Sequence, residues 1–297
     1  MVPARPTSAR LLDMQELSGK TAVITGAASG IGLAMAHRFG EAGMNLVLGD
    51  VQSDALDAAT TELSDTGYEV AAMQIDVRDL DGIRAFEAFA RENFGNVHVL
   101  CNNAGVGAGG PVSDPDNLDL WKWTIDINLW GVIYGCKVFM AGMLEHGEDA
   151  HIVNTASMAG HLSAPMMGPY NISKYGVVAL SETMAKEALM MGTKIGVSVL
   201  CPAFVATDIA TSDRNLPDDI KTAHGLDTPS ETSSSTQSAI EQLVASGIPP
   251  GDVAEAVHGA IVNNEFWILT HDETKLAITE RARQIVDGVN PSHLGFV

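Results

Sequence analysis

The chain has 297 residues, of which 46% are hydrophobic and 18% charged, a composition typical of an ordinary globular protein. Acidic residues outnumber basic ones by 37 to 17, so the formal net charge is −20 at pH 7. Because nucleic acids and anionic membranes bind basic surfaces, this charge disfavours both as partners.

The sequence predicts neither a secretion signal nor a membrane span. Residues 1–16 are expected to form a flexible tail without an apolar run of signal-peptide length. No window approaches the roughly 18 uninterrupted apolar residues that a transmembrane helix needs. The three cysteines stand in apolar runs, as buried free thiols do in a reducing compartment. The nine histidines form no H-E-x-x-H pair, the spacing of one common zinc site. We therefore expect a cytoplasmic protein without a metal site.

Short β-rich runs alternate with helical patterns along residues 17–297. The predicted strands are 21–25, 45–49, 70–75, 97–102, 151–156, 195–200 and 266–270. The predicted helices lie around 31–42, 53–65, 80–93, 117–144, 169–191 and 252–263. Several of these strands are continuously apolar, as expected for strands buried on both faces of a parallel sheet. This alternation predicts one α/β domain, a doubly wound, Rossmann-like parallel sheet of about seven strands with helices on both faces.

A glycine-rich turn follows the first predicted strand. Gly26, Gly30 and Gly32 stand in the pattern G-x-x-x-G-x-G, directly before an amphipathic helix. Glycine permits a tight turn and a close backbone approach to a pyrophosphate, which then sits at the helix N-terminus. The pattern predicts a dinucleotide site, and the alternative is a glycine-rich turn that only serves packing.

Asp50 ends the second predicted strand and bears on the choice of dinucleotide. A carboxylate there can accept hydrogen bonds from the adenosine ribose, and its charge repels a 2′-phosphate. Val51 follows it, and Ser29 in the glycine turn is neutral, so no basic residue flanks the site. NAD is therefore favoured over NADP, although an aspartate that only caps the end of a strand would look the same.

Ser157, Tyr170 and Lys174 form a group suited to proton transfer. Tyr170 and Lys174 are four residues apart, so in a helix they lie on one face, one turn apart. An ammonium group beside a phenol favours the phenolate, which makes Tyr170 a candidate general base with a lowered pKa. Ser157 ends the strand run H-I-V-N-T-A-S. The alternative is an ordinary surface tyrosine beside a helical lysine.

The long polar segment 208–250 follows the sixth predicted strand and interrupts the alternation. A loop of this length inside a compact domain is usually a functional lid or disordered. Ligands of open α/β sheets bind beyond the carboxyl ends of the strands, where this segment begins. We expect a mobile substrate lid here, and the alternative is a passive insertion.

With these motifs in order, the chain resembles the short-chain dehydrogenase/reductase family, closely over residues 17–207. Three further matches support the resemblance: Asp76-Val77 after the third strand, Asn102-Asn103-Ala104-Gly105 after the fourth, and Asn128 in D-I-N-L-W-G. The resemblance implies an NAD-binding site that comprises Gly26, Ser29, Gly30, Ile31, Gly32, Asp50, Val51, Asp76, Val77, Asn103, Ala104, Gly105, Tyr170, Lys174, Pro202, Val205 and Thr207.

The resemblance also implies a catalytic tetrad of Asn128, Ser157, Tyr170 and Lys174. In that mechanism the tyrosine exchanges a proton with the substrate oxygen while hydride moves between the carbinol carbon and the nicotinamide. The serine holds the substrate oxygen, the lysine lowers the tyrosine pKa and holds the nicotinamide ribose, and the asparagine anchors a water of a proton relay. The chain departs from the family at Ala203, where a glycine is usual, which predicts a small shift of the nicotinamide ring.

The substrate is expected to be a bulky apolar, aromatic or alicyclic secondary alcohol, or the matching ketone. The predicted pocket residues between the serine and the tyrosine are Met158, His161 and Met167, each of which could equally be a packing residue. Two other functions stay open, an NADP-dependent carbonyl reductase and a non-catalytic dinucleotide sensor. A cofactor-free relative that expels halide in an epoxide-forming step is disfavoured, because such a protein would replace the glycine turn and the lysine, and both are present here. As in much of the family, we expect a homodimer or homotetramer.

Overall fold

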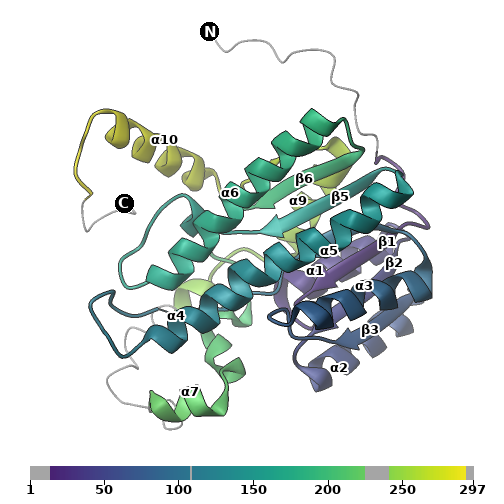
Figure 1. The fold of residues 1–297 in the computed structure, drawn as a ribbon, viewed down its shortest axis with the longest axis horizontal. Coiled ribbons are helices and arrows are strands. Elements are labelled where there is room, and N and C mark those ends of the chain that lie inside the picture. Colours follow the sequence, from purple (N-terminus) through teal and green to yellow (C-terminus); the bar gives the residue numbers. More distant parts are fainter. Residues whose placement is uncertain (1–13, 108, 225–240, 292–297) are drawn as a thin grey trace.

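A seven-stranded, entirely parallel sheet forms the centre of the molecule in the computed structural model, which describes residues 14–107, 109–224 and 241–291. The strands run in the spatial order β3-β2-β1-β4-β5-β6-β7 (Figure 1). Their bounds are β1 Thr21–Thr25, β2 Asn45–Asp50, β3 Val70–Gln74, β4 Val97–Asn102, β5 Ala150–Thr155, β6 Ile195–Leu200 and β7 Trp267–Ile268. The predicted fold class and all seven strands are confirmed, although β7 is shorter than expected.

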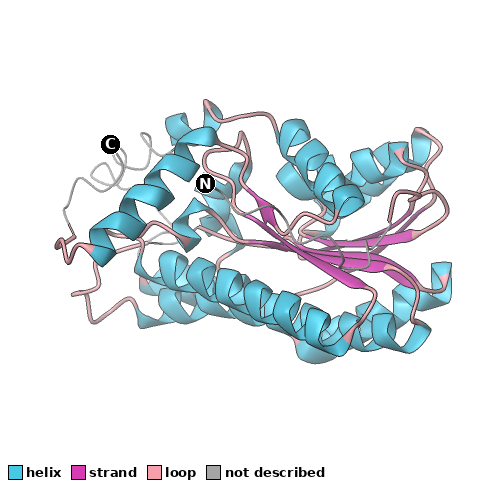
Figure 2. Cartoon of the chain, turned by 90° about the horizontal axis from the view of Figure 1, so that it is seen from above, coloured by secondary structure: helices cyan, strands magenta, loops and turns pink. Residues whose placement is uncertain are grey.

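Helices cover both faces of this sheet (Figure 2). The α-helices are α1 Gly30–Glu41, α2 Ser53–Asp65, α3 Leu80–Phe94, α4 Leu118–Ile125, α5 Gly131–His146, α6 Gly168–Met191, α7 Asp218–Ala223, α9 Pro250–Asn263 and α10 Asp272–Val286. The described residues also form the π-helix η1 Asp126–Trp130 and the 3₁₀ helices η2 Met158–Gly160 and η3 Asp208–Asn215. Helices α1 and α9 pack on one face, and α3, α5 and α6 on the other.

The middle residues of the strands are mostly apolar because alternate side chains enter two separate cores, one on each face of the sheet. On β1, Ala22 and Ile24 pack into the cluster beneath α1 and α9, and Val23 packs into the cluster beneath α3 and α5. All three side chains are fully buried. The two cores hold the sheet rigidly from both sides and leave its carboxyl edge for function.

The order in which strands are added to the sheet reverses between β1 and β4, which are neighbours in the sheet. From β1 the chain first adds β2 and β3 on one side, and then crosses to β4 on the other side. The loops after β1 and β4 therefore diverge, and ligands of this kind of sheet bind in the crevice that opens between them. This topology directs attention to the residues that follow Thr25 and Asn102.

Two helical regions differ from the predictions. The expected helix 117–144 is present as one continuous helical stretch, but it widens between α4 and α5 into the π-helix η1, which hydrophobic periodicity does not reveal. Helix α10 was not predicted, although Asp272 and Glu273 in its first turn and Arg283 in its last turn are the charges that a helix dipole favours. Figure 1 shows α10 extending away from the sheet, so most of its side chains have no core to face.

By length and composition alone, the stretch Leu118–His146 could cross a membrane. In the structure its second part, α5, lies against the sheet and buries Val132, Cys136, Phe139 and Met143 in the core. Its apolar character is thus accounted for by packing.

Candidate active site

The glycine turn after β1 has the conformation that the sequence pattern predicts. Gly26 and Gly30 have φ angles of 64° and 55°, in the left-handed region that favours glycine. A Cβ on Gly32 would lie 2.0 Å from the Gly26 carbonyl oxygen, so no other residue fits there. The turn delivers the chain to the N-terminus of α1, where Ser29 makes no side-chain capping hydrogen bond. Such a helix terminus presents free N–H groups and a positive dipole end to an anion.

The loop after β4 locks this turn in place. Asn103 Nδ2 donates to the carbonyl oxygens of Thr25 and Gly26, at 3.1 and 3.3 Å. In return Thr25 Oγ1 accepts the backbone N–H groups of Asn103 and Ala104, at 3.0 and 3.1 Å. The two loops that diverge from the switch point are therefore bound into one rigid floor, as expected for the Asn-Asn-Ala-Gly motif.

Asp50, at the end of β2, joins the same floor. Its Oδ2 accepts the Ala28 N–H and its Oδ1 accepts the Gln52 N–H, both at 3.0 Å. The residue is 9% exposed, and the neighbouring Val51 is 45% exposed. Each carboxylate oxygen keeps a lone pair for a further donor such as a ribose hydroxyl.

Asp76 and Val77 follow β3, at the same edge of the sheet. Burial alone would raise the pKa of Asp76, but the hydrogen bonds and the charge of Arg78 outweigh burial and lower it. The Arg78–Asp76 ion pair measures 2.6 Å. Val77 packs against Gly131 at the start of α5, so close that a Cβ on Gly131 would approach it to 2.8 Å. The acidic residue is thereby held ionised near the crevice.

A cleft of about 530 Å³ connects the glycine turn to the segment after β6. Its walls come from α1 and from the residues that follow Val205, namely Gly30, Leu33, Ala34, His37, Ala206, Thr207, Asp208, Ala245 and Pro250. Thr207 lies so near the turn that a Cβ on Gly30 would be 3.0 Å from its Cγ2. A cradle shaped by glycines, a helix N-terminus and an acceptor carboxylate fits a dinucleotide.

Ser157, Tyr170 and Lys174 meet on the other side of the same crevice. Ser157 directly follows β5, and the other two occupy the first turns of α6. The Ser157 hydroxyl lies near enough to Tyr170 to affect the pKa of its phenol, and Lys174 Nζ lies 5.5 Å from the centroid of the Tyr170 ring. The structure thus brings together the three residues that the sequence pairs only by spacing.

The pKa of Tyr170 differs from the expected direction. Burial raises it above the ordinary value of a tyrosine, and the hydrogen bond from Ser157 offsets burial only in part. Lys174 is 2% exposed, and burial lowers its own pKa to about 8. Its Nζ donates to the Thr155 carbonyl oxygen at 3.0 Å and does not contact the phenol oxygen. The Tyr170 pKa is thus raised where the sequence analysis expects it to be lowered, and a lowering of this pKa by Lys174 stays a prediction.

Asn128 lies in the π-helix η1 and is fully buried. Its side chain makes two hydrogen bonds to the Val106 backbone, one to the N–H and one to the carbonyl, both 2.8 Å long. A Cβ on Gly105 would lie 3.3 Å from Asn128 Oδ1 and 3.5 Å from Lys174 Nζ, so these three residues adjoin. Single π turns in helices occur frequently at functional sites, and this one places the fourth tetrad residue beside the lysine.

The three predicted pocket residues lie in the loop between β5 and α6. Met158 donates its backbone N–H to the Pro202 carbonyl at 2.8 Å, and Met167 bridges to Gly110 in the loop after β4. His161 faces the sheet edge, where its Nε2 is 3.5 Å from Cys201 Sγ and its ring centroid is 5.4 Å from that of Trp267. Their contact with a substrate stays a prediction.

The described part of the predicted lid packs over the carboxyl edge of the sheet. Leu216 forms a small apolar cluster with Val106 and Trp123, and Ser212 Oγ bonds both backbone groups of Gly107. The helical segments η3 and α7 replace the irregular loop expected at 208–223. Residues 225–240 of the predicted lid, like most of the predicted tail 1–16, lie outside the described residues.

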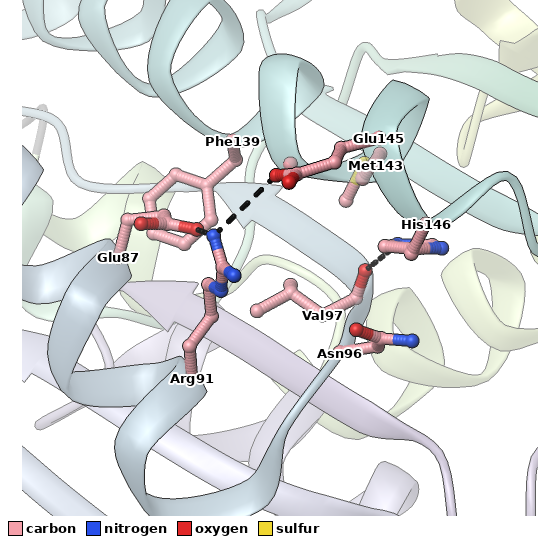
Figure 3. Close-up of a pocket in the computed structure, with 9 residues that line it drawn as sticks. Glu87, Arg91, Asn96, Val97, Phe139, Met143, Glu145 and His146 are labelled. Atoms are coloured by element: carbon pink, nitrogen blue, oxygen red, sulfur yellow. Dashed lines mark hydrogen bonds and ion pairs between the residues drawn. The ribbon is translucent and has the colours of Figure 1, made fainter.

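A second pocket, of about 220 Å³, lies between α3 and α5 (Figure 3). Arg91 stands between Glu87 and Glu145, at 3.8 and 3.7 Å, and His146 Nε2 is hydrogen-bonded to the Val97 carbonyl. Val97 begins β4, so this pocket is at the amino edge of the sheet, opposite the tetrad. Since ligands of this fold bind at the carboxyl edge, the crevice with the tetrad is the candidate active site.

One residue of the loop between β5 and α6 is held in a strained backbone conformation. Met166 has a φ angle of 65°, and its carbonyl accepts the Gly110 N–H at 2.6 Å. A non-glycine residue pays about 1–2 kcal/mol for this conformation. We expect Met166→Gly to raise the free energy of unfolding by about 0.5–1 kcal/mol, because relief of strain exceeds the added freedom of the unfolded chain. Urea denaturation measures this, and a loss of stability would show that the Met166 side chain contributes packing that outweighs the strain.

Known proteins share this arrangement. A family model described as short chain dehydrogenase matches residues 20–217. The solved structure of a short chain dehydrogenase/reductase from Burkholderia phymatum in complex with NAD superposes with a TM-score of 0.86 at 41% identity, covering 93% of this chain and 98% of that one.

Two curated relatives extend the match to nearly the whole chain. The CLA biosynthesis dehydrogenase/reductase of Lactiplantibacillus plantarum is 31% identical over 95% of this chain and 98% of its own length. The 1-deoxy-11-beta-hydroxypentalenate dehydrogenase of Streptomyces exfoliatus is 30% identical over 89% of this chain and 88% of its own. Together with the glycine cradle and the serine, tyrosine and lysine beside it, these matches establish that the chain belongs to the short-chain dehydrogenase family of oxidoreductases.

Proposed function

We propose that this protein is an NAD-dependent oxidoreductase that interconverts a secondary alcohol and a ketone, with Tyr170 as general acid and base. One observation carries the proposal: Ser157, Tyr170 and Lys174 adjoin each other across a crevice whose floor is the glycine cradle. A packing turn or an ordinary surface tyrosine would not explain this combination. The enzyme class is the short-chain alcohol dehydrogenase and ketone reductase.

The mechanism assigns one task to each side chain. Ser157 and Tyr170 are neighbours, so a ketone oxygen placed against both can accept from the serine hydroxyl and from the phenol and is held for proton transfer. Tyr170 accepts the hydroxyl proton in oxidation and returns it in reduction. Lys174, whose Nζ lies 5.5 Å from the centroid of the Tyr170 ring, would hold the nicotinamide ribose, and Asn128, which adjoins Lys174 at Gly105, would anchor a water of the proton relay. A bound nicotinamide supplies the hydride acceptor or donor and, when oxidised, a positive charge that favours the phenolate.

The cradle favours NAD as the cofactor. Gly26, Ser29, Gly30, Ile31 and Gly32 would hold the pyrophosphate, Asp50 the adenosine ribose, and Thr207 the nicotinamide end. The carboxylate of Asp50 repels a 2′-phosphate, and the exposed neighbour Val51 offers no positive charge to bind one. The solved relative named above with NAD supports the same choice.

The substrate is inferred to be a bulky apolar alcohol, aromatic or alicyclic. The methionines at 158, 166 and 167 stand in the loop between Ser157 and Tyr170 and carry flexible apolar side chains, which adapt to irregular ligands. The dehydrogenase name of the hydroxypentalenate relative fits oxidation of a hydroxyl group. A cytoplasmic location and a homodimer or homotetramer complete the proposal.

Two measurements test it. Calorimetric titration with NADH and NADPH should give the tighter binding for NADH. A panel of cyclic and aryl secondary alcohols, assayed with NAD by NADH absorbance, should then show turnover that increases with the apolar bulk of the alcohol. Tighter binding of NADPH would favour the carbonyl reductase, and tight NADH binding without turnover over a broad panel would favour the sensor.

The raised Tyr170 pKa predicts a pH effect with a definite sign. Without nucleotide, the Tyr170 phenol should stay protonated beyond pH 10, because burial disfavours the phenolate. Oxidation needs the phenolate, so its rate should rise with pH, whereas ketone reduction needs the phenol and should not. Ultraviolet difference titration of the wild type against Tyr170→Phe, with and without NAD, measures the pKa. A pKa below 10 in the free protein would contradict the prediction.

A further inference from the structure

His271 lies between β7 and α10, outside every motif that the sequence identified, and its ring contacts the segment after β6. Its Nδ1 accepts the backbone N–H of Ala203 at 3.3 Å, and its Nε2 lies 3.2 Å from the carbonyl oxygen of Phe204. It is the N-cap residue of α10 but makes no side-chain capping hydrogen bond there. The two ring nitrogens of His271 therefore make hydrogen bonds with the segment Ala203–Val205 and not with the helix that it precedes.

The backbone partners fix the protonation state of this ring. An N–H group can only donate, so Nδ1 must carry a lone pair; a carbonyl can only accept, so Nε2 must carry the hydrogen. Thr270 Oγ1, 2.8 Å from Nδ1, can donate to the same lone pair. The geometry thus specifies the neutral Nε2–H tautomer of His271.

The His271 ring lies next to the point where the backbone hydrogen bonds between β6 and β7 end. The last ladder bond joins the Cys201 N–H to the Ile268 carbonyl at 2.9 Å, and Pro202 has no N–H to continue it. The next N–H, that of Ala203, goes to the imidazole. From the other side, Ile248 donates to the Phe204 carbonyl at 3.1 Å and accepts from Ala206 at 3.0 Å.

We infer that His271 is a positioning residue that fixes the backbone of Ala203–Val205 and so sets the nicotinamide end of the cofactor site. The inference rests on the proposed function, because this segment runs directly into Thr207 at the cleft. It also bears on Ala203, whose Cβ replaces the hydrogen of the usual glycine.

The test compares NADH with ADP-ribose, which lacks the nicotinamide. His271→Phe removes both hydrogen bonds and keeps a ring of similar size; it should raise the Kd of NADH roughly tenfold, as the loss of about one net hydrogen bond predicts, and leave the Kd of ADP-ribose unchanged. His271→Gln retains one acceptor and one donor and should restore NADH binding to within about threefold of the wild type.

His146→Phe is the matched control. His146 is also half-buried and also bonds a backbone carbonyl, that of Val97 at 3.0 Å, but at the opposite edge of the sheet (Figure 3). It should leave both affinities unchanged. Equal weakening of NADH and ADP-ribose in His271→Phe, or no weakening of either, would overturn the inference. Failure of the wild type to bind NADH would instead refute the proposed cofactor.

A measurement on the wild-type protein keeps the inference testable if His271→Phe does not fold. Nitrogen-15 NMR of the histidine side chains, with His271 assigned by its absence from His271→Gln, reports the tautomer. A neutral ring with the hydrogen on Nε2 supports the two backbone bonds. A hydrogen on Nδ1 at neutral pH would overturn them, because that atom would then face the Ala203 N–H.

Discussion

Replacing Tyr170 with phenylalanine is expected to lower turnover by about 10²–10⁴-fold, the usual contribution of a general acid or base. The phenol is the group that exchanges the proton with the substrate oxygen, and phenylalanine keeps the ring and its packing on α6. NADH affinity should stay within about twofold of the wild type, since the cradle around Gly26–Gly32 is unchanged. Steady-state rates with the best alcohol of the panel and NADH fluorescence titration measure the two effects.

Tyr134→Phe is the matched control for this experiment. Tyr134 is half-buried on α5, where its ring packs against Trp130 at 5.6 Å between centroids, away from Ser157 and Lys174. Turnover in this variant should equal that of the wild type. Wild-type turnover in Tyr170→Phe would refute the assignment of the catalytic tyrosine, and an equal loss in both variants would indicate an effect on folding.

Replacing Gly32 with alanine is expected to abolish dinucleotide binding and to destabilise the protein by about 3 kcal/mol or more. The added Cβ would lie 2.0 Å from the Gly26 carbonyl oxygen and 2.8 Å from Asn103 Nδ2. The backbone of the turn would have to move away from α1, which also breaks the lock that Asn103 places on Gly26. Urea denaturation and NADH titration measure stability and binding.

Gly259→Ala provides the opposite control. Gly259 lies inside α9, and apart from its chain neighbours and the adjacent backbone of its own helix no described atom is within 4 Å of a Cβ built on it. Alanine there should stabilise the protein by up to about 1 kcal/mol, because it has the higher helix propensity, and should leave NADH binding unchanged. If Gly32→Ala binds NADH as the wild type does, the cradle is not the pyrophosphate site.

The sequence was sufficient to predict most of the fold, because strands and helices each leave a recognisable pattern of apolar residues in it. Strands such as Thr21–Thr25 are buried throughout and carry an apolar run at their centre, since they face two cores. Helix α3 carries its apolar residues Ile83, Phe86 and Ala90 at helical spacing. Helix α10 escaped notice because it has no core face to produce such a period. The π turn of η1 escaped because one extra backbone residue in a turn leaves no mark in the side-chain pattern.

Of the candidate site, the sequence likewise predicts one part, and only the tertiary structure determines the other. Gly26, Gly32, Ser157, Tyr170 and Lys174 could be identified from the sequence, since steric limits and helical spacing restrict which residue types serve at those positions. The tertiary structure alone decided the pKa values and the supports. Burial raises the pKa of Tyr170 and directs Lys174 to the Thr155 carbonyl, and a histidine 68 residues from Ala203 fixes the segment after β6. Burial and long-range hydrogen bonds depend on which distant segments meet, and no local pattern in the chain records that.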